Sequence, residues 1–190
     1  MNRCALAFLL PLAACHQPAP EQPTLAGARI GGPFTLTNQD GRTVTDKSFA
    51  GRYPIVYFGY TFCPDACPTD MGAIAAGLKQ VEASDPAKAA KVVPVFISVD
   101  PARDTPPVLK QFVGAFHPRA VGLTGSPAAI DAVAKEYGVA HSIGTKSPGG
   151  YLVDHSRAAY LMGPDGNPIA LAGADGGPAE VAKTIERWVK

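Results

Sequence analysis

One stretch, residues 54–81, does most to limit the folds open to this chain. It begins with a short apolar run, Pro54 to Tyr60, whose length is typical of a buried strand. After a Cys-x-x-x-Cys-Pro turn it continues as an apolar stripe at helical spacing: Met71, Ile74, Leu78 and Val81. The two cysteines, Cys63 and Cys67, are therefore predicted to lie where a strand passes into a helix.

The turn is predicted to place both thiols at the positive end of this helix. Pro68 suits the first helical position, because its missing N–H would have no partner there, and this puts Cys67 near the N-cap and Cys63 in the turn before it. Free N–H groups and the helix dipole favour thiolate over thiol at such a position. We therefore expect two activated sulfur ligands side by side.

The first 15 residues predict a secretory signal. Arg3 precedes an apolar run, Ala5 to Leu12, that is too short to cross a bilayer. The end of the run, Leu12-Ala13-Ala14-Cys15, resembles the lipobox of bacterial lipoproteins, in which the cysteine is acylated and becomes the first residue. An ordinary signal peptide with an incidental cysteine is the alternative. Labelled fatty acid should enter the wild type and be lost in Cys15→Ala.

Residues 16–27, rich in Pro, Gln and Ala, predict a flexible tether, and residues 28–190 predict one folded domain. A chain of 190 residues that is 46% hydrophobic and 17% charged can bury the core of one such domain. The formal net charge is +1 and no basic run is present, so nothing indicates nucleic-acid binding.

The order of elements after the tether predicts an α/β fold. Residues 33–45 read as a β-hairpin, and strands then alternate with helices as far as Gly138, which indicates parallel strands with right-handed crossovers. A Gly/Ser-rich loop, Ser142 to Gly150, precedes a second hairpin and a last helix. This order is that of a thioredoxin-like mixed sheet flanked by helices, with an N-terminal β-hairpin extension.

Cysteine counting leaves two thiols in the domain, because Cys4 leaves with the signal and Cys15 is the anchor. Outside the cytoplasm Cys63 and Cys67 would tend to form a disulfide. A purely structural disulfide closes too short a loop to stabilise much, and a structural zinc site lacks its second pair of ligands. Thioredoxin-type catalysts have two intervening residues, not three. Redox exchange and binding of a soft ion such as copper(I) remain.

A third ligand for such an ion is to be sought among four histidines. His16 lies in the tether, His117 precedes a proline at a helix end, and His141 lies in a loop-like segment. His155 lies on a polar turn just before a strand, where the fold can bring it beside Cys63. Spacing alone does not select among them.

Several other residues near these candidates have plain structural interpretations. Met71 and Met162 fit core positions better than thioether ligands. Asp154 either orients the His155 ring without binding the ion itself or is a solvated turn residue. Arg103 either pairs with a neighbouring aspartate and fixes the loop beside the site or belongs to a helix-entry turn, and we favour the second interpretation.

Four motifs occur in order between about Ala28 and Trp188. They are Gly31-Gly32-Pro33-Phe34, Tyr57-Phe58-Gly59-Tyr60-Thr61-Phe62-Cys63-Pro64-Asp65-Ala66-Cys67-Pro68, Ser98-Val99-Asp100-Pro101-Ala102-Arg103-Asp104-Thr105-Pro106 and Val153-Asp154-His155-Ser156. Together they resemble the Sco/SenC family of copper-binding, thioredoxin-like proteins. The resemblance implies a copper ion held by Cys63, Cys67 and His155. Ala66 and Thr69 depart from the common pattern, and neither is a ligand.

The resemblance also implies a metallochaperone, not an enzyme, that helps to assemble the binuclear copper centre of cytochrome c oxidase. Its partners would be the oxidase's copper subunit and either another copper chaperone or a thioredoxin-like reductant. We expect a monomer anchored to a bacterial membrane with its domain in the periplasm.

Two other functions use the same thiols. A thiol-disulfide oxidoreductase would act on cysteines of the oxidase subunit or of other partners through Cys63 and Cys67, without His155 as a ligand. A peroxide-reducing enzyme would oxidise Cys63 and resolve it with Cys67, which leaves His155 unexplained.

Overall fold

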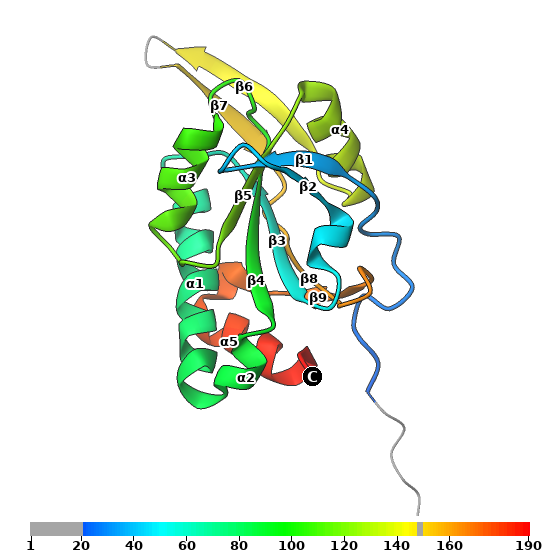
Figure 1. Cartoon of the computed structure of the whole chain (residues 1–190). Coiled ribbons are helices and arrows are strands. Elements are labelled where there is room, and N and C mark those ends of the chain that lie inside the picture. Colours follow the sequence, from blue (N-terminus) through cyan, green and yellow to red (C-terminus); the bar gives the residue numbers. More distant parts are fainter. Residues whose placement is uncertain (1–20, 148–149) are drawn as a thin grey trace, which may run out of the picture.

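A computed structural model describes residues 21–147 and 150–190. Its main sheet has seven strands in the order β2-β1-β5-β4-β3-β8-β9 (Figure 1). The three central strands are parallel: β3 (Tyr53–Gly59), β4 (Val92–Ser98) and β5 (Val121–Thr124). Antiparallel strands flank them: β1 (Thr35–Asn38) and β2 (Thr43–Thr45) on one side, β8 (Ala159–Met162) and β9 (Pro168–Leu171) on the other.

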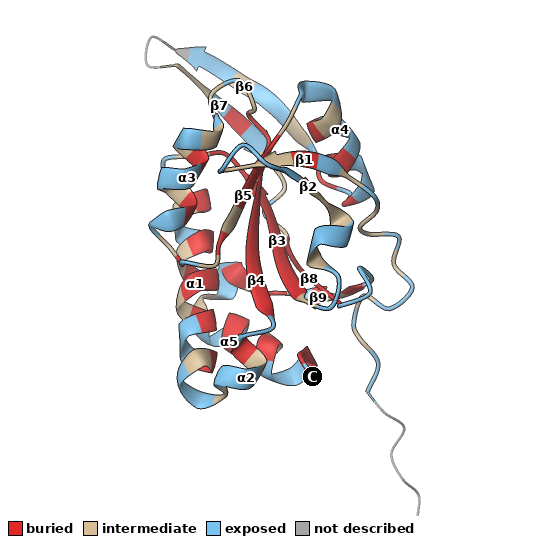
Figure 2. Ribbon diagram, viewed as in Figure 1, coloured by how far each residue is buried: buried red, intermediate tan, exposed pale blue. Residues whose placement is uncertain are grey.

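Helices cover both faces of this sheet. They are α1 (Ala66–Ser84), α2 (Pro86–Ala89), α3 (Pro106–Gly114), α4 (Pro127–Glu136) and α5 (Pro178–Trp188), with short 3-10 helices at Asp46–Phe49 and Ala174–Gly176. Alternation along β3 directs Tyr57 towards α1, where its hydroxyl meets Asp70, and directs Phe58 towards Tyr137 at the end of α4. Because both faces are covered, every residue of β3 and β4 is buried (Figure 2).

The predicted α/β order, the N-terminal hairpin and the strand–helix alternation are confirmed. The start of the first long helix is a correction. Helix α1 begins at Ala66 with Asp65 at its N-cap, so Cys67 is the second helical residue and Pro68 the third. Proline is tolerated throughout the first turn, because those N–H groups have no acceptor within the helix, and it therefore marks the start only approximately.

The predicted loop from Ser142 to Gly150 is also corrected. Strand β6 (His141–Ser147) pairs with β7 (Gly150–His155) in a separate two-stranded sheet that projects beyond one end of the main sheet (Figure 1). The segment has few apolar residues, so its strand character comes from the hydrogen bonds to β7. His155 is consequently the last residue of a strand instead of a turn residue.

Residues 21–27, assigned above to the tether, contact the domain. The Leu25 N–H donates to the carbonyl oxygen of Ile169 at 3.0 Å, and Glu21 pairs with Arg187. The predicted signal, Cys15, His16 and the rest of the tether lie outside the described residues. Within the described part of the chain, no helix combines the length and the apolar character needed to span a bilayer.

Candidate metal centre

Cys63, Cys67 and His155 come together at the end of the sheet that carries the β6–β7 ribbon. Their sulfur and ring-nitrogen atoms all lie within 4.8 Å of one another, and Cys67 Sγ is 3.3 Å from His155 Nε2. Among the described residues this is the one group of three His, Cys, Asp or Glu side chains found close enough to hold a metal ion. Two thiolates and an imidazole suit copper or zinc, and the thiolates favour copper(I).

The thiol turn is held in place by a buried carboxylate. Asp104, fully buried, accepts hydrogen bonds from the Thr61 N–H at 3.0 Å and the Thr61 hydroxyl at 2.6 Å, just before Cys63. It also accepts one from the Ser98 hydroxyl at 2.6 Å, at the end of β4. Burial raises the pKa of Asp104, and these hydrogen bonds oppose that rise. The motif around Asp100 thus shapes the site without supplying a ligand.

The two thiols have opposite electrostatic environments. Burial works to raise the pKa of Cys63, but N–H groups of Cys67, Asp65 and Ala66 point at its sulfur and bring the pKa below its ordinary value. Cys67 is fully buried, and this burial raises its pKa to about 12. The expectation of two activated thiols is therefore wrong for Cys67, because burial outweighs the helix terminus.

We expect alkylation to discriminate between the thiols of the reduced, metal-free protein. A pKa of about 12 lowers the thiolate fraction of Cys67 at pH 7 roughly a thousandfold relative to an ordinary thiol. Iodoacetamide should modify Cys63 first, with a rate that levels off at lower pH than for a free cysteine, as read by peptide mass spectrometry. Equal labelling of both thiols would contradict this assignment.

The imidazole of His155 is held with one nitrogen free for a metal. Its Nδ1 donates to the carbonyl oxygen of Ser156 at 3.0 Å; since a carbonyl only accepts, Nδ1 carries the proton. In the neutral ring Nε2 is then an acceptor, aimed at the protonated Cys67 thiol. Tyr57 and Tyr60 meet the ring edge-on, with centroids 6.2 and 5.9 Å away.

The other candidate histidines have different partners. His117 is 2% exposed, and its Nε2 lies 3.2 Å from Glu82. His141 is directly opposite His155 in the ribbon, yet its ring lies 3.2 Å from Asp131 of α4. Neither belongs to the ligand group.

The remaining sequence candidates lie as follows. Met71 and Met162 are 1% exposed and belong to the core, as predicted. Asp154 is exposed, and strand alternation turns it away from His155, whose Nδ1 is oriented by a backbone carbonyl instead. Cys63 and Cys67 are free thiols here, so their disulfide stays a prediction for the oxidised protein.

Sequence reasoning assigned no role to Asp70, Arg157 or Gly59, which all bear on the site. Asp70 is fully buried three residues after Cys67, and it accepts hydrogen bonds from Tyr57 and Arg157. The available signal was an acidic residue beside the apolar face of the first helix. Gly59 ends β3 where an added Cβ would lie 2.9 Å from the Cys67 sulfur.

Gly59→Ala is therefore expected to displace the Cys67 sulfur and to lower the free energy of unfolding by about 1–3 kcal/mol, as overpacking does. Its matched control is Gly72→Ala in α1, where an added Cβ meets nothing within 4 Å. Removing a glycine from a helix interior should stabilise by about 0.5–1 kcal/mol. Chemical denaturation measures the free energy of unfolding of both variants. Equal changes in that free energy would show that Gly59 is not needed for close packing.

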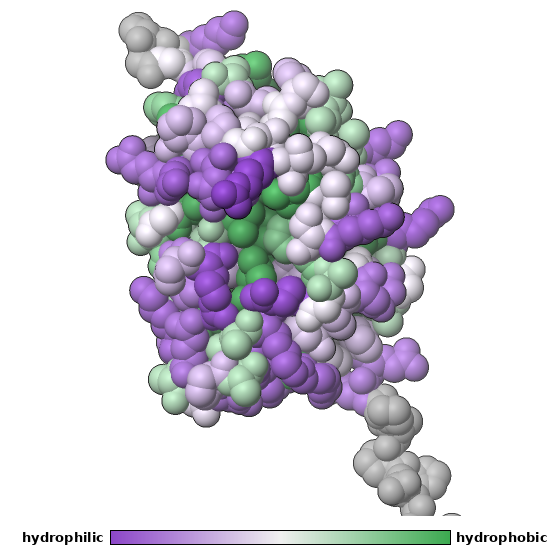
Figure 3. All heavy atoms as spheres, viewed as in Figure 1, coloured by the Kyte–Doolittle hydropathy of each residue, from purple (hydrophilic) through white to green (hydrophobic). Residues whose placement is uncertain are grey.

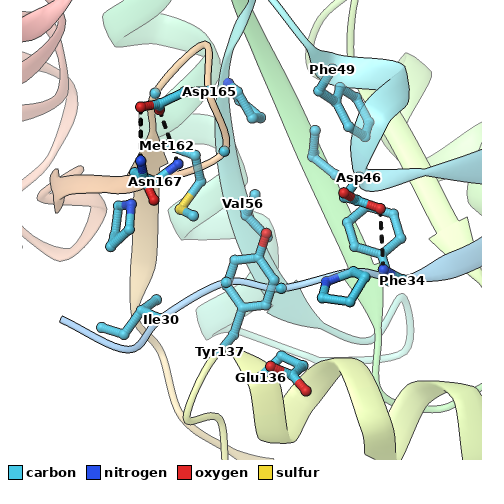
Figure 4. Close-up of a pocket in the computed structure, with 18 of the residues that line it drawn as sticks. Ile30, Phe34, Asp46, Phe49, Val56, Glu136, Tyr137, Met162, Asp165 and Asn167 are labelled. Carbon is cyan, nitrogen blue, oxygen red and sulfur yellow. Dashed lines mark hydrogen bonds between the residues drawn. The ribbon is translucent and has the colours of Figure 1, made fainter. Parts of the chain in front are cut away.

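A separate cavity of about 610 Å³ lies on the other face of the sheet. Figure 3 shows a hollow with apolar side chains at its bottom, and Figure 4 shows residues that line the cavity, among them Val56, Phe34 and Met162. Val56 precedes Tyr57 in β3 and so points away from the thiols. The cavity shares no residue with the Cys63–Cys67–His155 group.

Known sequences match most of this chain. A sequence model of the SCO1/SenC family matches residues 22–190. The chain belongs to the SCO1/SenC family. Protein SenC of Rhodobacter capsulatus is 43% identical over 160 residues, 84% of this chain and 71% of that protein. The mitochondrial SCO1 homolog 1 of Arabidopsis thaliana is 44% identical over 153 residues, 80% of this chain but only 45% of that protein.

Solved structures of the SCO1/SenC family share the fold. Arabidopsis thaliana ScoI with copper bound matches with a TM-score of 0.78 at 40% identity, covering 83% of this chain and 97% of that one. Bradyrhizobium japonicum ScoI with copper bound gives 0.75 at 41% identity, covering 84% and 99%. BsSco, described as a cytochrome c oxidase assembly protein with a disulfide switch, gives 0.63 at 29% identity, covering 83% and 92%.

The fold itself is thioredoxin-like. The thioredoxin domain of a thiol-disulfide oxidoreductase from Bacteroides vulgatus matches with a TM-score of 0.58, covering 85% of this chain and 96% of that one. At 16% identity, this match bears on the fold alone.

Proposed function

We propose that this protein binds one copper ion, Cu(I) or Cu(II), through Cys63, Cys67 and His155. The observation that carries the proposal is the convergence of these three ligand atoms within 4.8 Å. Both oxidation states find a suitable ligand, since thiolates favour Cu(I) and imidazole accepts Cu(II). Two copper-bound ScoI structures with the same fold support the choice of metal.

We further propose that the copper is cargo, delivered to the binuclear copper centre of cytochrome c oxidase. The thiols lose their protons when copper binds, so loading releases protons. Cys63 is partly exposed whereas Cys67 is fully buried. A partner's thiol would therefore meet the metal on the Cys63 side first, and ligand exchange would proceed from there. The BsSco assembly protein supports this assignment.

The docked segment 21–27 lies far from the metal centre. Residues 21–27 dock near β9 and α5, at the end of the sheet opposite to the β6–β7 ribbon (Figure 1). If Cys15 is lipidated at a periplasmic membrane surface, the metal centre lies at the far end of the domain from the docked segment.

Delivery is tested by copper transfer in vitro. Cu(I)-loaded protein is mixed anaerobically with the soluble copper domain of the oxidase subunit, and the two proteins are separated and assayed for metal. We expect copper in the oxidase domain after mixing, and the Cys63→Ser variant should carry less copper into the mixture because it loads poorly. Retention of all copper on this protein would contradict a delivery role.

The second candidate function is that of a thiol-disulfide oxidoreductase. It is favoured by the different pKa values of the two thiols, lowered for Cys63 and raised for Cys67. The Cys63 thiolate would attack a partner disulfide and release one partner thiol; Cys67 would then displace the other and close a Cys63–Cys67 disulfide. The partner is reduced and this protein oxidised, so a thioredoxin-like reductant must restore the dithiol. The disulfide switch described for BsSco supports this chemistry. A mixed disulfide trapped by Cys67→Ser would establish it.

A further inference from the structure

We infer that two polar contacts, one on each side of His155 in the chain, hold its imidazole above the thiol pair. Arg157 binds Asp70, and Tyr151 binds Asp100 and Arg103. These are positioning residues, which touch no metal themselves. The inference deepens the copper function proposed above and rests on it for its consequence, though the contacts can be tested without copper.

The first contact joins the residue two places after His155 to the thiol helix. Arg157 donates from Nε and Nη2 to the two carboxylate oxygens of Asp70, at 3.1 and 2.8 Å. Such a two-point contact fixes direction as well as distance. Asp70 is fully buried and also accepts the Tyr57 hydroxyl at 2.9 Å. Without Arg157 its carboxylate would be buried with no counter-charge, so the pairing is strongly favoured.

The second contact joins the residue four places before His155 to the loop after β4. The Tyr151 hydroxyl donates to Asp100 at 2.8 Å, and Asp100 also pairs with Arg103. The Arg103 guanidinium lies over the Tyr151 ring, 3.7 Å from its centroid. A cation stacked on the ring and a hydrogen bond from its hydroxyl fix both ends of the same side chain.

One contact ends on the helix that carries Cys67, and the other ends on the loop that binds the turn before Cys63. Asp70 follows Cys67 by three residues in α1. Asp100 lies in the loop whose Asp104 binds Thr61, just before Cys63. These two charged contacts thus help to join the thiol half of the site to the imidazole half.

The Tyr60 hydroxyl also meets the backbone of Val153, but one neutral hydrogen bond fixes the ribbon less firmly than the two contacts above. The other described hydrogen bonds of the ribbon near His155 reach different places. Ser156 and Ala140 exchange two hydrogen bonds, at 3.0 and 3.1 Å, which close the ribbon on itself. His141 ties the ribbon to Asp131 of α4. The edge-on rings of Tyr57 and Tyr60 limit the tilt of the imidazole but give no directed bond to it.

Loss of either contact should change the affinities for Cu(I) and Cu(II) by different amounts. Cu(I) is satisfied by two thiolates, whereas Cu(II) depends on the nitrogen ligand. Loss of a contact lets the ribbon move and lowers the fraction of molecules in which Nε2 of His155 faces both sulfurs. Cu(II) affinity should therefore fall more than Cu(I) affinity.

The test compares Arg157→Ala, Arg157→Lys and Tyr151→Phe with a matched control, Arg187→Ala. The control also removes an arginine from an ion pair, with Glu21, but at the other end of the domain. Two readouts are taken. One is amide hydrogen exchange of residues 151–155 in the metal-free protein; the other is affinity for Cu(II) and Cu(I), measured by chelator competition with the sulfur-to-Cu(II) absorption band followed in parallel.

We expect Arg157→Ala to speed exchange in the ribbon and to weaken Cu(II) binding by about 10–100-fold, the range typical of residues that orient a ligand. Arg157→Lys should recover part of both losses, Tyr151→Phe should show a smaller effect, and Arg187→Ala none. Wild-type exchange and Cu(II) affinity in Arg157→Ala would overturn the inference; if that variant does not fold, wild-type exchange and Cu(II) affinity in Tyr151→Phe would overturn it. A wild-type protein that binds no copper defeats the proposed function, while the exchange data still decide the contacts.

Discussion

Serine in place of Cys67 is expected to weaken Cu(I) binding by more than about 100-fold, above the range seen for residues that merely orient a ligand. The hydroxyl oxygen is a hard donor that does not replace a thiolate on a soft ion. Serine is close to cysteine in size, and it can keep a hydrogen bond to His155, so the fold should persist. Anaerobic competition with a chromophoric Cu(I) chelator measures the change, and circular dichroism checks the fold.

The control for this substitution is Thr69→Ser, an exposed change two residues further along α1 that removes no ligand. It should leave Cu(I) affinity unchanged, whereas Cys63→Ser should match Cys67→Ser. Wild-type affinity in either cysteine variant would show that copper is not held by the thiol pair.

Alanine in place of His155 should shift and weaken the sulfur-to-Cu(II) absorption bands, and it should lower Cu(II) affinity by more than about 100-fold, because Cu(II) loses its nitrogen ligand while both thiolates stay. Cu(I) affinity should fall less, because two thiolates suffice for that ion. Titration of the soluble domain with each oxidation state, read by absorption spectroscopy, separates the two effects.

His141→Ala is the matched control, because His141 lies opposite His155 in the same ribbon and pairs with Asp131. It should bind both copper ions as the wild type does. Disulfide exchange through Cys63 and Cys67 should survive in His155→Ala. If this variant loses copper affinity but keeps disulfide exchange, the two candidate functions are separable. Full Cu(II) affinity in His155→Ala would remove that residue from the site.

Most of the fold could be predicted from local pattern. β3 and β4 are continuous apolar runs, and prolines mark the starts of α3, α4 and α5. The β6–β7 ribbon could not be predicted, since β6 has few apolar residues and owes its structure to a partner strand. Pairing with the next strand therefore gives this segment its strand structure, although the local pattern indicated a loop.

The candidate site also has a part that the local sequence pattern predicts and a part that it does not. Cys63 and Cys67 follow from one local turn, whereas His155 was singled out by resemblance, since no spacing rule joins residues 88 positions apart. The pairing of Asp70 with Arg157, 87 positions apart, had no signal in the pattern beyond one acidic residue near an apolar face. The high pKa of Cys67 was missed because burial, which only the fold determines, outweighs the helix terminus.

X-ray absorption at the copper edge tests the proposed ligand set most directly. The soluble domain is loaded with one equivalent of Cu(II), and the spectrum is compared with that of the His155→Ala variant. We predict two sulfur neighbours and one imidazole nitrogen around copper in the wild type, with the nitrogen signal lost in the variant. A wild-type spectrum without sulfur, or an imidazole signal that persists without His155, would contradict the three-ligand centre.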